Sequence, residues 1–248
     1  MNTLFKVRLW ACVAIFALCV HVKSDISDYI YPSKSPSFGN FGGLGVLQNP
    51  SARFYDEGSI AFNWVQNGVY RRGSIVMYPF DWFEFSYQYT DIDNAKYSLI
   101  KEFSGGQSYK DKSFDVKAKI FSERGIFPSV AIGARDLAGT GEFASEYIVS
   151  SKKIGSLDLS IGIGWGVLGT DNNISNPLTT LHESFRNRDS ESGQGGALSY
   201  RSWFSGNAAI FGGLEYDLPR RGLRLKLEYD TSNPDTRGVV REVNSRFN

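Results

Sequence analysis

Two residue patterns in this sequence look like phosphate-binding loops. Residues 164–169 (Gly-Trp-Gly-Val-Leu-Gly) match G-x-G-x-x-G and follow a strand-like stretch, but a dinucleotide site also needs a helix N-terminus immediately afterwards. The next residues, Thr170-Asp171-Asn172-Asn173, lead into a proline-containing loop. We therefore interpret these glycines as thinning the inner face of a curved strand. The glycine-rich stretch at 38–45 lacks the Lys and Ser/Thr of a P-loop, which favours turning backbone.

Paired carboxylates and a lone histidine are the other candidates for chemistry. Asp91 with Asp93, and Asp56 with Glu57, have the residue types of a glycosidase pair. Both pairs lie in turn-like sequence, where short acidic side chains are common. His182 lies in a polar stretch without Ser or Asp at an informative spacing, and there is no G-x-S-x-G elbow. The sequence thus predicts no catalytic residues, no metal site, no cofactor and no enzyme.

The N-terminus has the pattern of an export signal. Lys6 and Arg8 precede an apolar run at 9–22, which is short for a membrane-spanning helix. We predict a signal peptide at residues 1–24, with a short membrane anchor as the alternative. Cleavage would remove both cysteines of the sequence, Cys12 and Cys19. The mature chain would then form no disulfide and no Cys/His zinc site, which fits a periplasmic or outer-membrane protein.

Composition points to a β-rich domain. The chain has 248 residues and a net charge of +1, which gives no electrostatic case for binding nucleic acid. Aromatic residues make up 15%, beside 26 Gly and only 8 Pro. That mixture suits many strands joined by glycine-rich turns, and it excludes disordered and collagen-like chains.

Alternation with period two predicts the strands that would position any site. Phe83, Phe85, Tyr87 and Tyr89 alternate with polar residues, and the same pattern recurs at 114–120, 157–165 and 223–230. No later segment is long and apolar enough for a transmembrane helix. A polar stretch at 171–196, containing a candidate helix at 178–188, is predicted to be a surface loop. Weaker strands are predicted at 58–66, 71–79, 96–103, 129–136, 144–152, 198–204 and 207–216.

Two architectures fit these strands. The charged faces suit the solvent side of a β-sandwich or the lumen of a barrel, whereas aromatic residues near strand ends are typical of outer-membrane barrels. We predict an all-β, antiparallel up-and-down transmembrane β-barrel of roughly ten strands. The expected segments are a signal peptide (1–24), an extended glycine-rich segment (25–57), the barrel (58–230) and a tail (231–248). Residues expected to face lipid are Phe83, Phe85, Tyr87, Leu159, Ile161, Ile163, Leu225 and Leu227.

Several ordered motifs resemble a known family. They are Ile-Gly-Ala-Arg-Asp-Leu-Ala-Gly-Thr-Gly at 132–141, its continuation at 143–152, Gly-Ile-Gly-Trp-Gly at 162–166, and the stretch from 211–216 through 223–229. The opening at 43–53 (Gly-Leu-Gly-Val-Leu-Gln-Asn-Pro-Ser-Ala-Arg) fits as well. Together they resemble the YjbH/GfcD family of outer-membrane proteins associated with exopolysaccharide or capsule production. The resemblance implies an outer-membrane barrel with a role in polysaccharide export or assembly.

The resulting hypothesis is a non-enzymatic outer-membrane protein of exopolysaccharide (capsule or biofilm) biosynthesis or export. Its expected partners are outer-membrane lipid, polysaccharide and other polysaccharide-export proteins, with no nucleic acid. A small-solute porin and a secreted glycan-binding β-sandwich are the alternatives. Charged residues on the polar faces could contact a polymer, or could form a salt-bridged plug network. These candidate lumen residues are Arg135, Asp136, Glu146, Lys152, Arg224, Lys226 and Glu228.

Overall fold

The fold is seen in a computed structural model that describes residues 36–98, 100–188, 202–218 and 223–233. The signal peptide expected at 1–24 and most of the tail expected at 231–248 lie outside these residues.

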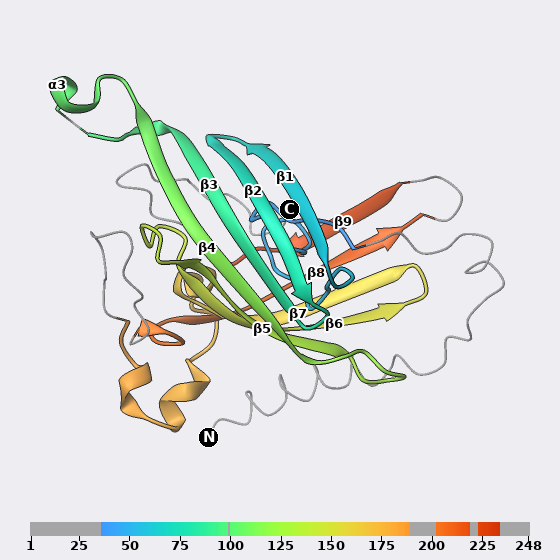
Figure 1. The fold of residues 1–248 in the computed structure, drawn as a ribbon. Helices are drawn as coiled ribbons and strands as arrows, with labels where there is room; N and C mark the ends of the chain where they lie inside the picture. Colours follow the sequence, from blue (N-terminus) through green and yellow to red (C-terminus); the bar gives the residue numbers. More distant parts are fainter. Residues whose placement is uncertain (1–35, 99, 189–201, 219–222, 234–248) are drawn as a thin grey trace.

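All strands of the described chain belong to one antiparallel sheet of nine strands, ordered β1 to β9 as they occur in the sequence (Figure 1). This confirms the all-β, up-and-down prediction. The strands do not divide into two sheets, as a sandwich would require. Their bounds are β1 Ser59–Asn67, β2 Tyr70–Phe80, β3 Phe83–Lys96, β4 Ser108–Phe121, β5 Ser129–Leu137, β6 Ser145–Ile154, β7 Leu157–Trp165, β8 Ala208–Asp217 and β9 Arg224–Tyr229.

Tight turns hold the register at one end of several hairpins. Asn67 pairs with Tyr70 and Ile154 pairs with Leu157, so only two residues link each strand pair. Gly68 and Gly155 have positive φ angles of 58° in these turns. Glycine adopts this backbone region without the steric cost that a Cβ brings, so these positions favour the turn.

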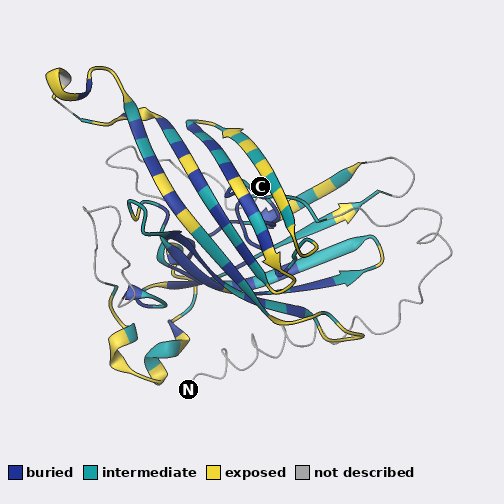
Figure 2. Ribbon diagram, viewed as in Figure 1, coloured by how far each residue is buried: buried dark blue, intermediate teal, exposed yellow. Residues whose placement is uncertain are grey.

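The two faces of the sheet differ in chemistry. Along β3, Glu84, Ser86 and Gln88 are buried on the inner face, while Phe83 and Phe85 point outward. Figure 2 shows the resulting stripes of buried and exposed residues along the strands. The predicted alternation is therefore confirmed, and the enclosed side carries polar and charged residues together with buried apolar ones such as Val76, Val149 and Phe211.

The sheet is not closed into a barrel within the described residues. A closed barrel requires its first and last strands to pair. Here β1 pairs only with β2, and β9 pairs only with β8. The prediction of a closed barrel of roughly ten strands is corrected to a curved, open sheet of nine.

Three local predictions were wrong or only partly right. The strand expected at 96–103 is absent because the pairing of β3 with β4 ends at Lys96 and Ser108. Between these residues lie a turn, in which the Ile100 amide donates to Ser98 Oγ, and the short helix α3 (Lys101–Ser104). Within the expected strand at 198–204, the described residues form a turn.

The candidate helix at 178–188 is instead two 3-10 turns, η2 (Pro177–Thr180) and η3 (Glu183–Phe185), which are capped by the side chains of Asn176 and His182. A third turn of this kind, η1 (Gly166–Gly169), follows β7. No helix in the described part of the chain has the length and apolar character needed to cross a membrane.

Candidate functional site

Residues 36–55, here called the N-terminal segment, lie inside the curve of the sheet. The segment forms no regular strand, only isolated bridges such as Phe38 with Leu44 and Gly45 with Pro50. Figure 1 shows it in blue within the curled sheet. Its position is fixed by contacts to side chains of the inner face, which make up the candidate functional site.

Glu228 of β9 anchors the middle of the segment. Its carboxylate, 1% exposed as a residue, accepts hydrogen bonds from the backbone amides of Leu47, Gln48 and Asn49 at 2.9–3.1 Å. Asn49 returns two bonds, donating from Nδ2 to the carbonyls of Gly212 (3.2 Å) and Tyr229 (2.8 Å). Charged acceptors form stronger hydrogen bonds than neutral ones, so this is a firm attachment.

Two cations on β9 extend the anchor toward the β8–β9 turn. Lys226 lies 3.0 Å from Glu215 and also donates to the carbonyl of Val46. Arg224 pairs with Asp217 at 2.7 Å and with Glu215 at 3.4 Å. These pairs balance the charges on this part of the inner face.

A buried ion pair on β3 and β4 holds the tip of the segment. Lys117 Nζ lies 2.9 Å from Glu84 Oε2, and the two side chains are 1% and 8% exposed. Glu84 also accepts from Tyr78 Oη (2.8 Å) and from the Leu44 amide (3.3 Å). A Cβ at Gly43 would come too close to Glu84 Oε1, so glycine lets the backbone approach this carboxylate without displacing it.

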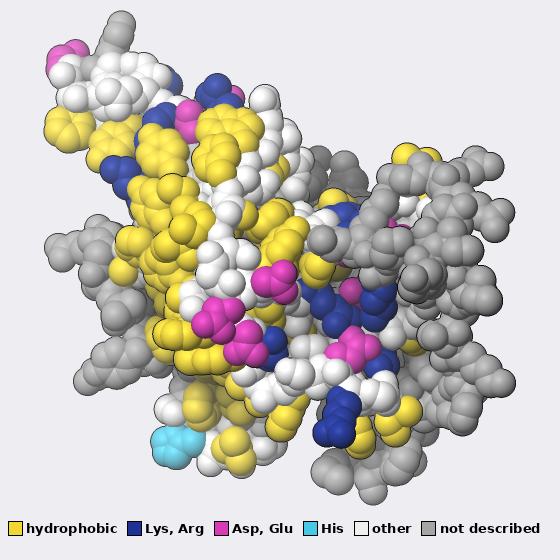
Figure 3. All heavy atoms as spheres, turned by 45° about the vertical axis from the view of Figure 1, so that its right-hand side comes forward, with side chains coloured by type: hydrophobic (Ala, Val, Ile, Leu, Met, Phe, Trp, Pro, Cys, Tyr) yellow, Lys and Arg dark blue, Asp and Glu magenta, His cyan; other side chains and the backbone are white. Residues whose placement is uncertain are grey.

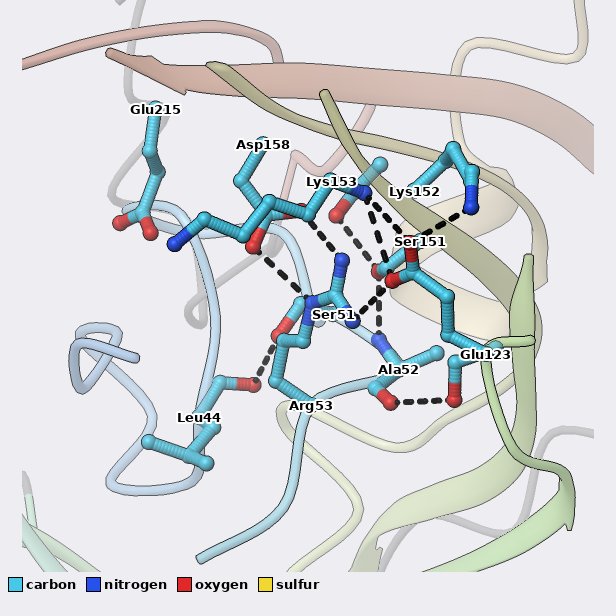
Figure 4. Close-up of polar contacts among 12 residues, drawn as sticks. Leu44, Ser51, Ala52, Arg53, Glu123, Ser151, Lys152, Lys153, Asp158 and Glu215 are labelled. Atoms are coloured by element: carbon cyan, nitrogen blue, oxygen red, sulfur yellow. Dashed lines mark hydrogen bonds and ion pairs between the residues drawn. The ribbon is translucent and has the colours of Figure 1, made fainter. Parts of the chain in front are cut away.

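Arg53 joins the end of the segment to two hairpins, as Figure 4 shows. Its guanidinium donates to both oxygens of Asp158 (2.7 and 2.9 Å) and to Glu123 (2.6 Å), which also pairs with Lys152 at 2.7 Å. Beside it, the Ala52 amide donates to Ser151 Oγ at 2.8 Å. Burial disfavours the charged form of Glu123, but the hydrogen bonds from Lys152 and Arg53 outweigh that effect, so the pKa of this carboxyl lies below its ordinary value.

Arg72 of β2 and Arg135 of β5 enclose the ring of Phe41. The guanidinium carbons of Arg72 and Arg135 lie 4.5 and 4.3 Å from the Phe41 centroid. Arg72 also lies over Tyr70 and Phe143, at 4.6 and 4.9 Å. Cation–π contacts of this kind are strongest where water is excluded, as it is around Arg72, which is 2% exposed.

Loop residues are tied to two more buried carboxyl groups. Glu146 receives both terminal nitrogens of Arg188 (2.7 and 2.9 Å) and the Phe204 amide (2.9 Å). Asp136 accepts from the Phe143 amide at 2.9 Å. The loop residues around Arg188 thus dock on the sheet through charge-assisted bonds, and those around Phe143 dock through the bond to the Asp136 carboxyl.

The seven candidate lumen residues are all buried or half-buried, but the structure does not gather them into one cluster. Arg135, Lys226 and Glu228 touch the N-terminal segment directly, while Lys152 shares Glu123 with Arg53. Arg224 pairs within β8–β9, and Asp136 and Glu146 hold loops. Their role in contacting polysaccharide stays a prediction.

Sequence reasoning missed Arg53, Arg72, Glu84, Lys117 and Glu123 as parts of this network. Glu84 and Lys117 lie on the polar sides of strands that alternation had already identified, so that signal could have found them. Arg53 closes the 43–53 motif but has no periodic neighbour. Only the fold brings it to Asp158, 105 residues further along the chain.

The residues that were considered for catalysis make local contacts in the structure. Asp91 and Asp93 both bind Arg71. His182 is exposed, and its side chain accepts from the Ser184 amide in its own turn. Of the glycines at 164–169, Gly164 lies on the buried face of β7, where a Cβ would collide with Leu168. Gly166 and Gly169 lie in the 3-10 turn η1, beyond the strand that they were expected to thin. The described residues contain no group of three or more His, Cys, Asp or Glu placed to hold a metal ion.

Comparison with known families matches a model named YjbH, described as "Exopolysaccharide biosynthesis protein YbjH", to residues 37–248. The chain belongs to the YjbH family. The resemblance inferred from the motifs is thereby confirmed.

A curated relative from Escherichia coli (strain K12), named "Uncharacterized lipoprotein YjbH", is 43% identical over 221 residues. The alignment covers 88% of this chain and 32% of the relative, so the chain spans about a third of that family member's length. No solved structure matches the chain.

Proposed function

We propose that this protein is a non-enzymatic component of exopolysaccharide biosynthesis or export, with its strands in the outer membrane and its polar inner face toward the polymer. The observation that carries the proposal is the orientation of the sheet: apolar side chains point outward and charged ones inward. The family description supplies the process.

The outer face supports a lipid environment. Ile60, Phe62 and Trp64 of β1 are 61–72% exposed, and Figure 3 shows hydrophobic side chains gathered in a broad patch. Exposed apolar area of this extent is rare on soluble monomers. Strands β1, β2, β6, β7 and β8 have 9–11 residues, the length that a tilted strand needs to cross a bilayer.

The inner face supports a passive role. Its ion pairs Glu84–Lys117, Glu123–Arg53 and Glu215–Lys226 satisfy one another's charges. Groups paired in this way bind and orient polar partners. They are not arranged as a nucleophile with a base, or as two carboxylates across an open cleft.

Deletion of the gene tests the proposal. Released and surface polysaccharide should fall while intracellular sugar-nucleotide levels stay unchanged, because the protein would act after sugar activation. Single substitutions at Arg135, Glu146 or Lys226 should give graded losses, whereas an enzyme would lose nearly all turnover with one change. Unchanged polysaccharide in the deletion strain would contradict the proposal, and altered uptake of small solutes would then favour a porin.

A further inference from the structure

Along residues 44–52, the inner face binds several main-chain groups of the N-terminal segment. Glu228 accepts from three successive amides, and Glu84 accepts from the Leu44 amide. Lys117 and Lys226 donate to the carbonyls of Leu44 and Val46. These side chains therefore recognise donors and acceptors that do not depend on which side chains the bound segment carries.

The same rule holds where the segment leaves the inner face. Ser151 accepts from the Ala52 amide at 2.8 Å, and Ser129 donates to the Ala52 carbonyl at 2.9 Å. The sheet thus offers acceptor and donor side chains along residues 44–52. A polymer of hydroxyl groups, each able to donate and accept, could take over each of these bonds.

If the segment moves away, the polar groups that it contacted on the inner face need new hydrogen-bond partners. Buried carboxylates such as Glu84 and Glu228 are strongly destabilised if their hydrogen-bond donors are removed and not replaced. Water or a hydroxyl-rich chain must therefore take the segment's place. An aromatic ring is present as well, since Tyr78 packs at 64° against the ring of Tyr55 of the segment, with centroids 5.7 Å apart.

The charges on this surface indicate which sugar chain fits. Lys117 and Lys226 offset the charges of Glu84 and Glu228, but Lys226 also pairs with Glu215. Displacement of the segment would also take Arg53 away from Asp158 and Glu123, so the uncovered surface has an excess of carboxylates. A strongly anionic polymer would meet repelling carboxylates along the same path. An uncharged chain meets only hydrogen-bonding groups.

We infer that the inner surface beneath residues 44–53 is a binding surface for an uncharged, hydroxyl-rich sugar chain, and that the N-terminal segment occupies it as a displaceable substitute. The inference rests on the proposed role in polysaccharide export. It adds the class of ligand and the competition between the segment and the polymer.

A reversible lock on the segment tests this. Val46 and Gly213 are in contact: a Cβ at Gly213 would lie 3.0 Å from Val46 Cγ2. In the full chain, Val46→Cys with Gly213→Cys should form a disulfide that holds the segment in place. Released polysaccharide should fall to the level of the deletion strain when the bond is formed, and should return when a reductant opens it.

A matched control crosslinks the sheet without touching the segment. Ile163 and Ile210 lie opposite each other on β7 and β8, so Ile163→Cys with Ile210→Cys should leave export unchanged under oxidising conditions. If the reduced first variant does not support export, a second lock, Ala52→Cys with Ser151→Cys, replaces it. Released polysaccharide should again fall when the disulfide is formed and return on reduction.

Normal export with the lock fully formed would overturn the inference, as would equal loss in the control. Both results differ from failure of the proposed function, which would appear as normal polysaccharide in the deletion strain itself. Export lost only in the locked, oxidised variants, and regained on reduction, supports displacement of the segment.

Discussion

The outer and inner faces of this sheet differ in which side chains they expose and which they bury. On the outer face, side chains such as Phe62 are 70% exposed, whereas on the inner face the residues Lys117 and Glu228 are each 1% exposed. In ordinary antiparallel sheets one face is apolar and packed while the other is polar and wet. Here the enclosed side carries the buried charges, beside apolar residues such as Val76 and Phe211, while the exposed side is apolar.

This contrast changes what each face needs for stability. The outer face lacks only an apolar environment, and any single outer residue contributes through area alone. The inner face needs specific partners, because each buried charge must be paired and hydrogen-bonded. Much of that pairing comes from the N-terminal segment, so the segment is as much part of the fold as the strands.

The largest expected effect comes from leaving a buried charge without its partner. Glu84→Ala should reduce the free energy of unfolding by about 3–5 kcal/mol, because Lys117 would remain buried and unpaired. The exposed pair Arg186–Glu183 provides the control, and Glu183→Ala should cost at most about 1 kcal/mol. Urea unfolding in detergent micelles measures both. Equal costs would mean that the inner face is hydrated.

A charge placed on the outer face tests the lipid environment. Ile161→Arg should cost about 2–4 kcal/mol for folding into bilayers if this position lies near the midplane. Lys226→Ala, on the inner face, should cost much less because Glu215 keeps Arg224 as a partner. Spin labels at 161 and 226 give an independent reading: water at 161 and lipid-dissolved oxygen at 226 would contradict the assigned faces.

Two asparagines allow a buried contact to be compared with an exposed one. Asn49 and Asn173 each make two hydrogen bonds to strand backbone, but only Asn49 is buried. Asn49→Ala should destabilise the protein by about 1–3 kcal/mol, since buried carbonyls lose donors. Asn173→Ala should have the smaller effect because water replaces the lost bonds. The unfolding midpoints of the two variants measure this difference. A larger shift for Asn173→Ala would contradict the role of Asn49 in anchoring the segment to the inner face.

The smallest expected effect concerns the pH dependence of the ion pair between Glu123 and Arg53. Because the pKa of Glu123 is held below its ordinary value of 4.5, its contribution to stability is present at neutral pH and is lost as pH falls through the lowered pKa. The wild type should therefore lose more stability between pH 6 and about pH 3 than Glu123→Gln does. Unfolding midpoints across that range measure the difference. Parallel pH profiles would show that the Glu123 pairs contribute nothing to stability.

Much of the fold follows from alternation in the sequence. The period-two runs placed Phe83 and Ile161 on one face and Lys226 on the other, and the structure agrees for each. The rule works because successive side chains of a strand must point to opposite sides. Where alternation was weak, as at 96–103, the expected strand was absent.

Short-range rules also failed where a side chain captured the backbone. The candidate helix at 178–188 is split into two 3-10 turns. The side chains of Asn176 and His182 accept hydrogen bonds from the backbone amides of Leu178 and Ser184, and so cap each turn separately. Such local competition is expected of short polar side chains. Its outcome depends on the loop's other contacts, among them the three carbonyls bound by Asn176.

The sequence by itself determined which residues alternate, and therefore which charges share a face. It could not determine what those charges bind. Glu228 and the amides it holds are about 180 residues apart in the chain, and Arg53 reaches two separate hairpins. Only the curved sheet brings these groups within hydrogen-bond distance, because a buried charge selects its partner by position in space and not by spacing along the chain.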